Sequence, residues 1–154
     1  MAQFFSKLTR TGFVSGVTRY EDHYPGQEDS ARMVIPLVVA GQLTVPAIVD
    51  TGAPWCILDP EIAEWVQDAV QALYTPEQRL MIRGVLYRGR LLRLTLTLPS
   101  FQGESLQVEA TVFVPILTNG EIWTLPNFVG LDGFLNRMRF AIDPTENSFY
   151  FGPM

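Results

Sequence analysis

Strict alternation of apolar and polar side chains constrains this chain more than any other feature. Leucine occupies every second position from residue 92 to 98, with arginine or threonine between. Residues 106–114 repeat the pattern with leucine, valine and alanine, and Pro99 to Gly103 mark the turn between the two runs. Successive side chains of a β-strand point to opposite faces, so each run predicts a strand with one buried face.

Further strand patterns lie on both sides of this pair. Runs rich in β-branched and aromatic residues, bounded by Pro, Gly and Asn, predict strands over residues 13–20, 31–40, 42–49, 139–143 and 148–152. The second and third should form a hairpin that turns at Ala40-Gly41, and the last two a hairpin around residues 144–147.

One amphipathic helix is predicted after Asp59, which can cap it, with Pro60 suited to the first turn. Apolar side chains at helical spacing then form one stripe that should pack on the sheet: Ile62, Trp65, Val66, Ala69, Val70 and Leu73. A second, short helix is predicted from Leu131 to Met138. Many short strands with two helices indicate a mainly β, barrel-like domain.

The chain has 154 residues, of which 47% are hydrophobic and 18% charged. This length predicts a single domain, residues 1–154, and the composition excludes intrinsic disorder. The longest apolar stretch, residues 33–41, contains Pro36 and is shorter than the ~20 residues of a membrane-spanning helix. Cys56 is the only cysteine, which excludes a disulfide framework and a multi-thiolate metal site. We therefore expect a cytoplasmic protein without a membrane segment.

A net charge of −5 argues against a nucleic-acid partner, because neutralising phosphates requires clustered cations. One local exception is a group of five arginines within fifteen residues: Arg79, Arg83, Arg88, Arg90 and Arg93. They are either solvated charges that guard a strand edge or a rim that attracts acidic groups of a substrate or partner. Only convergence with a pocket would favour the second interpretation.

One stretch has residues that could perform catalysis. It is an apolar strand that runs directly into Asp50, Thr51, Gly52 and Ala53. Asp-Thr-Gly is good turn chemistry, so Asp50 could simply accept a backbone hydrogen bond at a corner. Residue frequencies give such a tetrapeptide by chance in roughly 1–2% of chains this long.

Together with a second segment, this stretch resembles the retropepsin-like aspartic proteases. In that family, apolar residues lead into Asp-Thr-Gly-Ala, and an apolar-apolar-Gly segment packs beneath the loop before a short helix. Here the second segment is Phe128-Val129-Gly130, and the resemblance covers about residues 33–152. It implies a closed retropepsin-like barrel with one amphipathic and one short helix.

The resemblance also implies an activity, the hydrolysis of peptide bonds in a polypeptide substrate without metal or cofactor. Two carboxylates about 3 Å apart share one proton and so supply both a base and an acid. Because the motif occurs once, the expected enzyme is a homodimer in which each protomer contributes Asp50. By resemblance, Thr51 would hydrogen-bond across the twofold axis and Gly52 would let backbone approach the carboxylates.

The flap that covers the substrate in this family should include Gly84, Val85, Leu86 and Tyr87. This stretch is short and has few glycines, which motivates an alternative: a retropepsin-like binding or assembly module that hydrolyses nothing. A third hypothesis, an accidental motif, predicts that Asp50 and residues 128–130 lie far apart in the fold.

Three other candidate residues have simpler interpretations. Asp132 should cap or turn the chain after the second segment, and His23 should lie on a surface loop. Cys56 should be a small buried hydrophobe. Serine or cysteine hydrolase chemistry would need a well-placed histidine, and His23 is a poor candidate.

Overall fold

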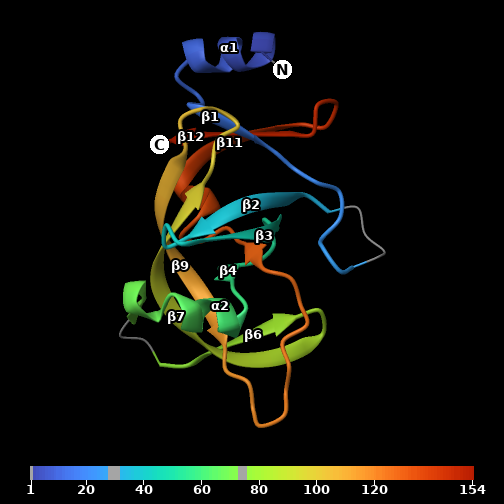
Figure 1. Ribbon diagram of the computed structural model, residues 1–154, viewed down its shortest axis with the longest axis vertical. Coiled ribbons are helices and arrows are strands. Elements are labelled where there is room, and N and C mark those ends of the chain that lie inside the picture. The colour runs from blue at the N-terminus through green and yellow to red at the C-terminus, as the bar shows by residue number, and fades with distance from the viewer. Residues whose placement is uncertain (1, 28–31, 73–75) are drawn as a thin grey trace.

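The computed structural model describes residues 2–27, 32–72 and 76–154 (Figure 1). In chain order its elements are α1 (Ala2–Arg10), β1 (Gly16–Arg19), β2 (Val34–Val39), β3 (Leu43–Val49), β4 (Cys56–Ile57), α2 (Pro60–Trp65), η1 (Gln67–Ala69), β5 (Gln71–Ala72), β6 (Gln78–Ile82), β7 (Val85–Leu98), β8 (Gln102–Gly103), β9 (Leu106–Pro115), β10 (Phe128–Val129), η2 (Leu135–Arg137), β11 (Met138–Asp143) and β12 (Ser148–Pro153). None of the helices in this part of the chain is long and apolar enough to span a membrane.

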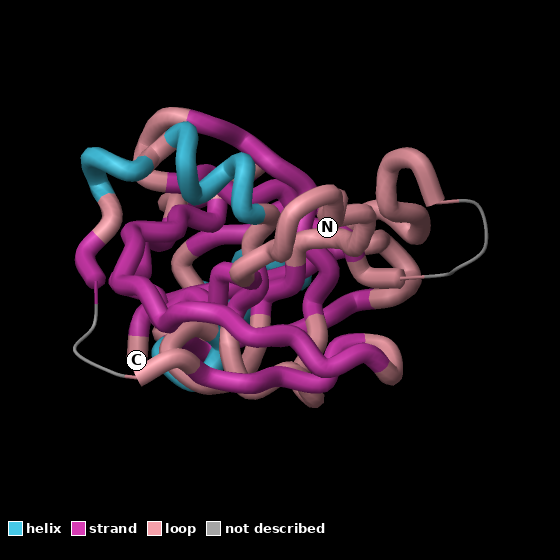
Figure 2. Tube along the Cα trace, turned by 90° about the horizontal axis from the view of Figure 1, so that it is seen from below, coloured by secondary structure: helices cyan, strands magenta, loops and turns pink. Residues whose placement is uncertain are grey.

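Six strands close into a barrel. They are hydrogen-bonded in the order β2-β3-β10-β4-β9-β7, and β7 pairs back with β2 where Val38 lies opposite Thr97. The two alternating runs that dominate the sequence form the longest antiparallel pair, β7 with β9, and their alternate apolar side chains are buried in the main core. The prediction of a mainly β closed barrel is therefore confirmed (Figures 1 and 2).

A second sheet of four strands, in the order β11-β12-β1-β8, lies beside the barrel. Phe149 and Phe151 of β12 belong to the barrel core, whereas Tyr150 points the other way into a small cluster with Phe5 of α1 and Val17. Because successive side chains of β12 point to opposite faces, this strand contributes to both the barrel core and the small cluster. The sequence analysis did not predict α1, which consists of only nine residues.

Both predicted hairpins are present. β2 and β3 pair in register over their length and turn at Ala40 and Gly41, with φ of 52° and 67°. Two successive positive φ values suit the twist of a tight hairpin turn. β11 and β12 form the second hairpin.

The two predicted helices are shorter than expected, so their predicted ends are wrong. α2 ends at Trp65 and gives way to the single turn η1, and the backbone is extended by Val70. Residues 71–72 pair with β7 as β5, and this strand pairing overrides the helical pattern.

Trp65 illustrates the consequence, because it is 80% exposed instead of packing on the sheet, while Val66 is buried. Ala69 is exposed as well, and Leu73 lies outside the described residues. The second helix is reduced to η2, because Met138 already begins β11.

Candidate active site

The Asp50 loop begins where β3 ends, and three hydrogen bonds donated by backbone amides define its shape. The amide of Asp50 donates to the carbonyl of Val129 at 3.0 Å, and the amide of Ala53 donates to the carbonyl of Asp50 at 3.1 Å. The amide of Gly52 donates to Asp50 Oδ1 at 2.9 Å. The half-buried carboxylate is therefore held by its own loop, while Thr51 is exposed at the tip.

The second segment lies directly beside this loop. β10 pairs in parallel with β3, with Phe128 opposite Ile48 and Val129 opposite Val49, and antiparallel with β4. The hypothesis of an accidental motif, which required the two segments to lie far apart, is therefore wrong. The cause is the central position of β10, which fills the gap between β3 and β4 in the barrel.

Gly130 is a position where backbone packs closely against backbone. A Cβ added there would lie 2.2 Å from the carbonyl oxygen of Trp55 and 2.8 Å from that of Ala53. The next amide, of Leu131, donates to the Ala53 carbonyl at 2.8 Å. Only glycine allows this approach of backbone to backbone, so Gly130 supports the loop by having no side chain.

Asn127 is not among the predicted site residues, yet it connects three distant segments of the chain just before β10. Its buried side chain accepts a hydrogen bond from the Asp59 amide at 2.9 Å and donates one to the Pro46 carbonyl at 3.1 Å. The Tyr24 hydroxyl lies 3.2 Å from both the side-chain and backbone nitrogens of Asn127. The only sequence signal was its place immediately before Phe128, since its partners lie far away along the chain.

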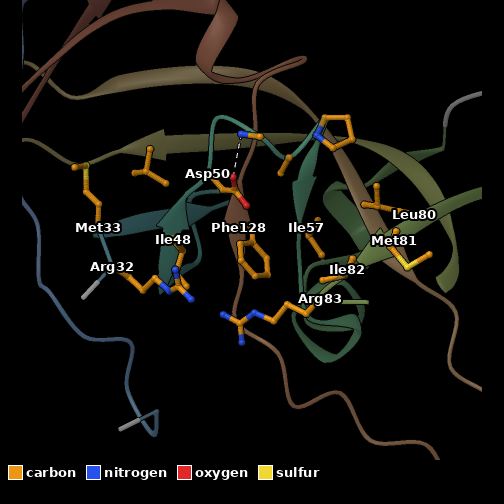
Figure 3. A pocket seen from close by; sticks show the side chains of 14 residues that line it. Arg32, Met33, Ile48, Asp50, Ile57, Leu80, Met81, Ile82, Arg83 and Phe128 are labelled. Atoms are coloured by element: carbon orange, nitrogen blue, oxygen red, sulfur yellow. Dashed lines mark hydrogen bonds between the residues drawn. The ribbon is translucent and has the colours of Figure 1, made fainter. Parts of the chain in front are cut away.

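A cavity of about 520 Å³ opens beside the Asp50 carboxylate. The Asp50 loop forms one wall, and apolar side chains that include Ile48, Ile57 and Phe128 form another (Figure 3). Among the described residues that line the cavity, Asp50 is the only one with a carboxylate. The site thus places one carboxylate beside a wall of apolar side chains.

The β6–β7 hairpin provides the remaining wall. Its turn consists of Arg83 and Gly84, with φ of 49° and 82°. The side that lines the cavity runs from Leu80 to Arg83, whereas the candidate flap residues Gly84, Val85, Leu86 and Tyr87 do not line it.

Within the candidate flap, Val85 and Leu86 are exposed. Tyr87 packs edge-on against Trp123, with ring centroids 5.2 Å apart. The loop that contains Trp123 therefore packs against the β6–β7 hairpin. This contact was not predicted from the sequence.

Of the five clustered arginines, only Arg83 lines the cavity. Arg88 pairs with Glu77 at 3.4 Å, and Arg79 lies opposite Arg88 on the exposed part of the hairpin. A second arginine, Arg32, lines the cavity from the segment before β2 and was not singled out by the sequence analysis.

The three remaining candidates behave as expected. His23 is exposed in a loop, and Asp132 lies in the turn after Gly130, where its carboxylate accepts a bond from Asn136 at 3.3 Å. Cys56 is fully buried, and that burial raises the pKa of its thiol to about 12. Because a nucleophilic cysteine needs a thiolate, Cys56 cannot serve as one.

The arrangement of strands is similar to that of solved retropepsin-like structures. A retropepsin-like aspartic protease from Rickettsia conorii superposes with a TM-score of 0.51 and 16% sequence identity over 88% of this chain and 98% of that one. The retroviral protease-like domain of Ddi1 from Leishmania major gives a TM-score of 0.49 and 18% identity over 82% and 96%. No protein-family model and no curated protein sequence matches. The chain therefore has a retropepsin-like fold.

Proposed function

We propose that this protein is an aspartic endopeptidase that acts as a homodimer, with Asp50 of each protomer forming the catalytic pair. One observation carries the proposal: the Asp50 carboxylate lies at the end of β3, backed by the parallel Phe128-Val129-Gly130 segment, on the wall of a peptide-sized cavity. Because Cys56 is its only cysteine, the chain forms no internal disulfide, which is consistent with the proposed reducing, cytoplasmic compartment.

The chemistry follows from bringing two such carboxylates together. At about 3 Å apart they cannot both ionise, so they share one proton and titrate as a pair. The charged carboxylate takes a proton from a water molecule while the water oxygen attacks the peptide carbonyl. The neutral carboxyl group protonates the leaving amine. Thr51, which is exposed at the loop tip, would hydrogen-bond to a partner's loop, and the apolar walls would hold substrate side chains.

The test compares Asp50→Asn with Asp132→Asn on a mixed peptide library from acidic to neutral pH. Asp132 is an exposed carboxylate in the adjoining turn, so its substitution controls for loss of charge. We expect cleavage to fall by about 10²–10⁴-fold in Asp50→Asn and to persist in Asp132→Asn. Cleavage that survives in Asp50→Asn would contradict the assignment.

A second candidate function is a retropepsin-like binding or assembly module without hydrolysis. It is favoured by the short two-residue turn of the β6–β7 hairpin and by the candidate flap residues, which lie outside the cavity. This candidate predicts that no peptide is cleaved at any pH, while Asp50→Asn still dimerises and retains bound peptide.

A further inference from the structure

Two arginines from distant parts of the chain reach into the Asp50 cavity. Arg32 belongs to the segment before β2, and Arg83 to the turn of the β6–β7 hairpin. Figure 3 shows their guanidinium groups extending from two sides toward the same end of the cavity, with the Phe128 ring between them and Asp50. The cavity therefore has an acidic end and a basic end.

Neither guanidinium forms an ion pair or hydrogen bond with a described residue. The Arg83 guanidinium lies over the Phe128 ring, 5.7 Å from its centroid, which favours this position without supplying a counter-charge. By contrast, Arg88 on the same hairpin is paired with Glu77. Both side chains are exposed, so water and salt weaken the repulsion between these two cations. With no partner among the described residues, both cations would attract an anion placed between them.

The backbone is held by a hydrogen bond at Arg32 and takes an unusual conformation at Arg83. The amide of Arg32 donates to the Asp22 carbonyl. Arg83 has a φ of 49°, a left-handed conformation that costs about 1–2 kcal/mol for a residue with a Cβ. A glycine would avoid this cost, so an arginine at the turn is consistent with a use for its side chain.

We propose that Arg32 and Arg83 together bind a carboxylate of the substrate, supplied by an aspartate or glutamate side chain near the scissile bond. A guanidinium presents paired N–H donors that match a carboxylate, and such charged hydrogen bonds are about twice as strong as neutral ones. The apolar walls would hold the neighbouring apolar side chains. This specificity rests on the proposed peptidase function, because it assigns the substrate class of the same site.

The test uses peptides from the cleaved set in matched pairs that differ only by glutamate or glutamine at each position around the scissile bond. At one position or more, we expect the wild-type kcat/KM to favour glutamate by at least about tenfold. Arg32→Gln and Arg83→Gln should each reduce this preference, mainly through KM, and Arg83→Glu should shift it toward lysine. Arg79→Gln, on the exposed part of the hairpin, should retain it.

Two results would overturn the proposal. One is equal cleavage of the glutamate and glutamine peptides. The other is a loss of kcat/KM on amidation of the peptide C-terminus that is equal for the glutamate and glutamine peptides, because the bound carboxylate would then be the chain end. Binding gives a readout without hydrolysis: glutamate and glutamine versions of peptides that Asp50→Asn retains from the mixed library should show the same preference by fluorescence anisotropy. If wild type cleaves nothing but this preference persists, the peptidase proposal fails and the arginine site stands.

Discussion

At the scale of single residues, the barrel places a thiol where it has no access to water. Cys56 lies in β4, between β9 and β10, and is fully buried. Desolvation disfavours the charged thiolate and raises the pKa of Cys56 to about 12. In the unfolded chain the same thiol has an ordinary pKa of about 8.5.

This difference predicts that folding stability falls at alkaline pH. Above pH of about 8.5 the unfolded thiol loses its proton while the native one keeps it, so the unfolded state gains stability. The free energy of unfolding should fall by about 2 kcal/mol between pH 8 and 10. Urea titrations at the two pH values measure it.

Cys56→Ala is the matched control for the alkaline loss. It removes the titrating group, so most of the loss between pH 8 and 10 should disappear in this variant. Burial also raises the pKa of Tyr24 above its usual 10, which places the effect of that phenol at still higher pH. Equal slopes in wild type and Cys56→Ala would contradict the assignment to the thiol.

At the scale of elements, the β2–β3 hairpin delivers Asp50 to the cavity, and its turn is strained. Ala40 takes a φ of 52°, a conformation that glycine adopts without cost. The following Gly41 already has the residue type that its φ of 67° requires. The strain therefore lies at a single position of the turn.

Ala40→Gly should stabilise the protein. Removing the left-handed cost outweighs the added freedom of the unfolded chain, for a net gain of about 0.5–1 kcal/mol in the free energy of unfolding. Ala47→Gly, in the buried middle of β3, is the matched control and should destabilise. Thermal or urea unfolding measures both, and destabilisation by Ala40→Gly would show that the turn carries no such strain.

The same scale shows which elements the sequence could predict. β7 and β9 were predictable because their alternation reports one buried face. α2 was predicted too long, since a helical stripe cannot report that residues 71–72 pair with β7. Asn127 was missed because its value depends on Pro46, Asp59 and Tyr24, none of which is near it in sequence.

At the scale of the whole molecule, the proposed active site would be complete only in a dimer. Each chain contributes one Asp-Thr-Gly loop, so a heterodimer of wild type and Asp50→Asn should be inactive. An equal mixture that exchanges subunits should then contain about one quarter active dimers, against one half without exchange. The wild-type activity should fall accordingly.

Peptide cleavage after incubation of the mixed proteins measures this effect. Mixing wild type with Asp132→Asn is the control and should leave activity intact. Dilution gives a second check, because activity per protomer should fall as sedimentation shows the dimer dissociating. If wild-type activity changes neither on mixing with Asp50→Asn nor on dilution, one chain carries a complete site.

By itself, the sequence determined the strand-rich architecture, the hairpin turns and the two segments worth comparing, because alternation, Pro and Gly act over a few residues. Only the tertiary structure decided that Asp50 and Phe128-Val129-Gly130 lie side by side, and that Arg32 and Arg83 enter the same cavity. These are long-range arrangements, set by which strands pair when the barrel closes. The order of residues along the chain does not show which distant strands pair, so only the fold showed that Arg32 and Arg83 form the basic end of the cavity.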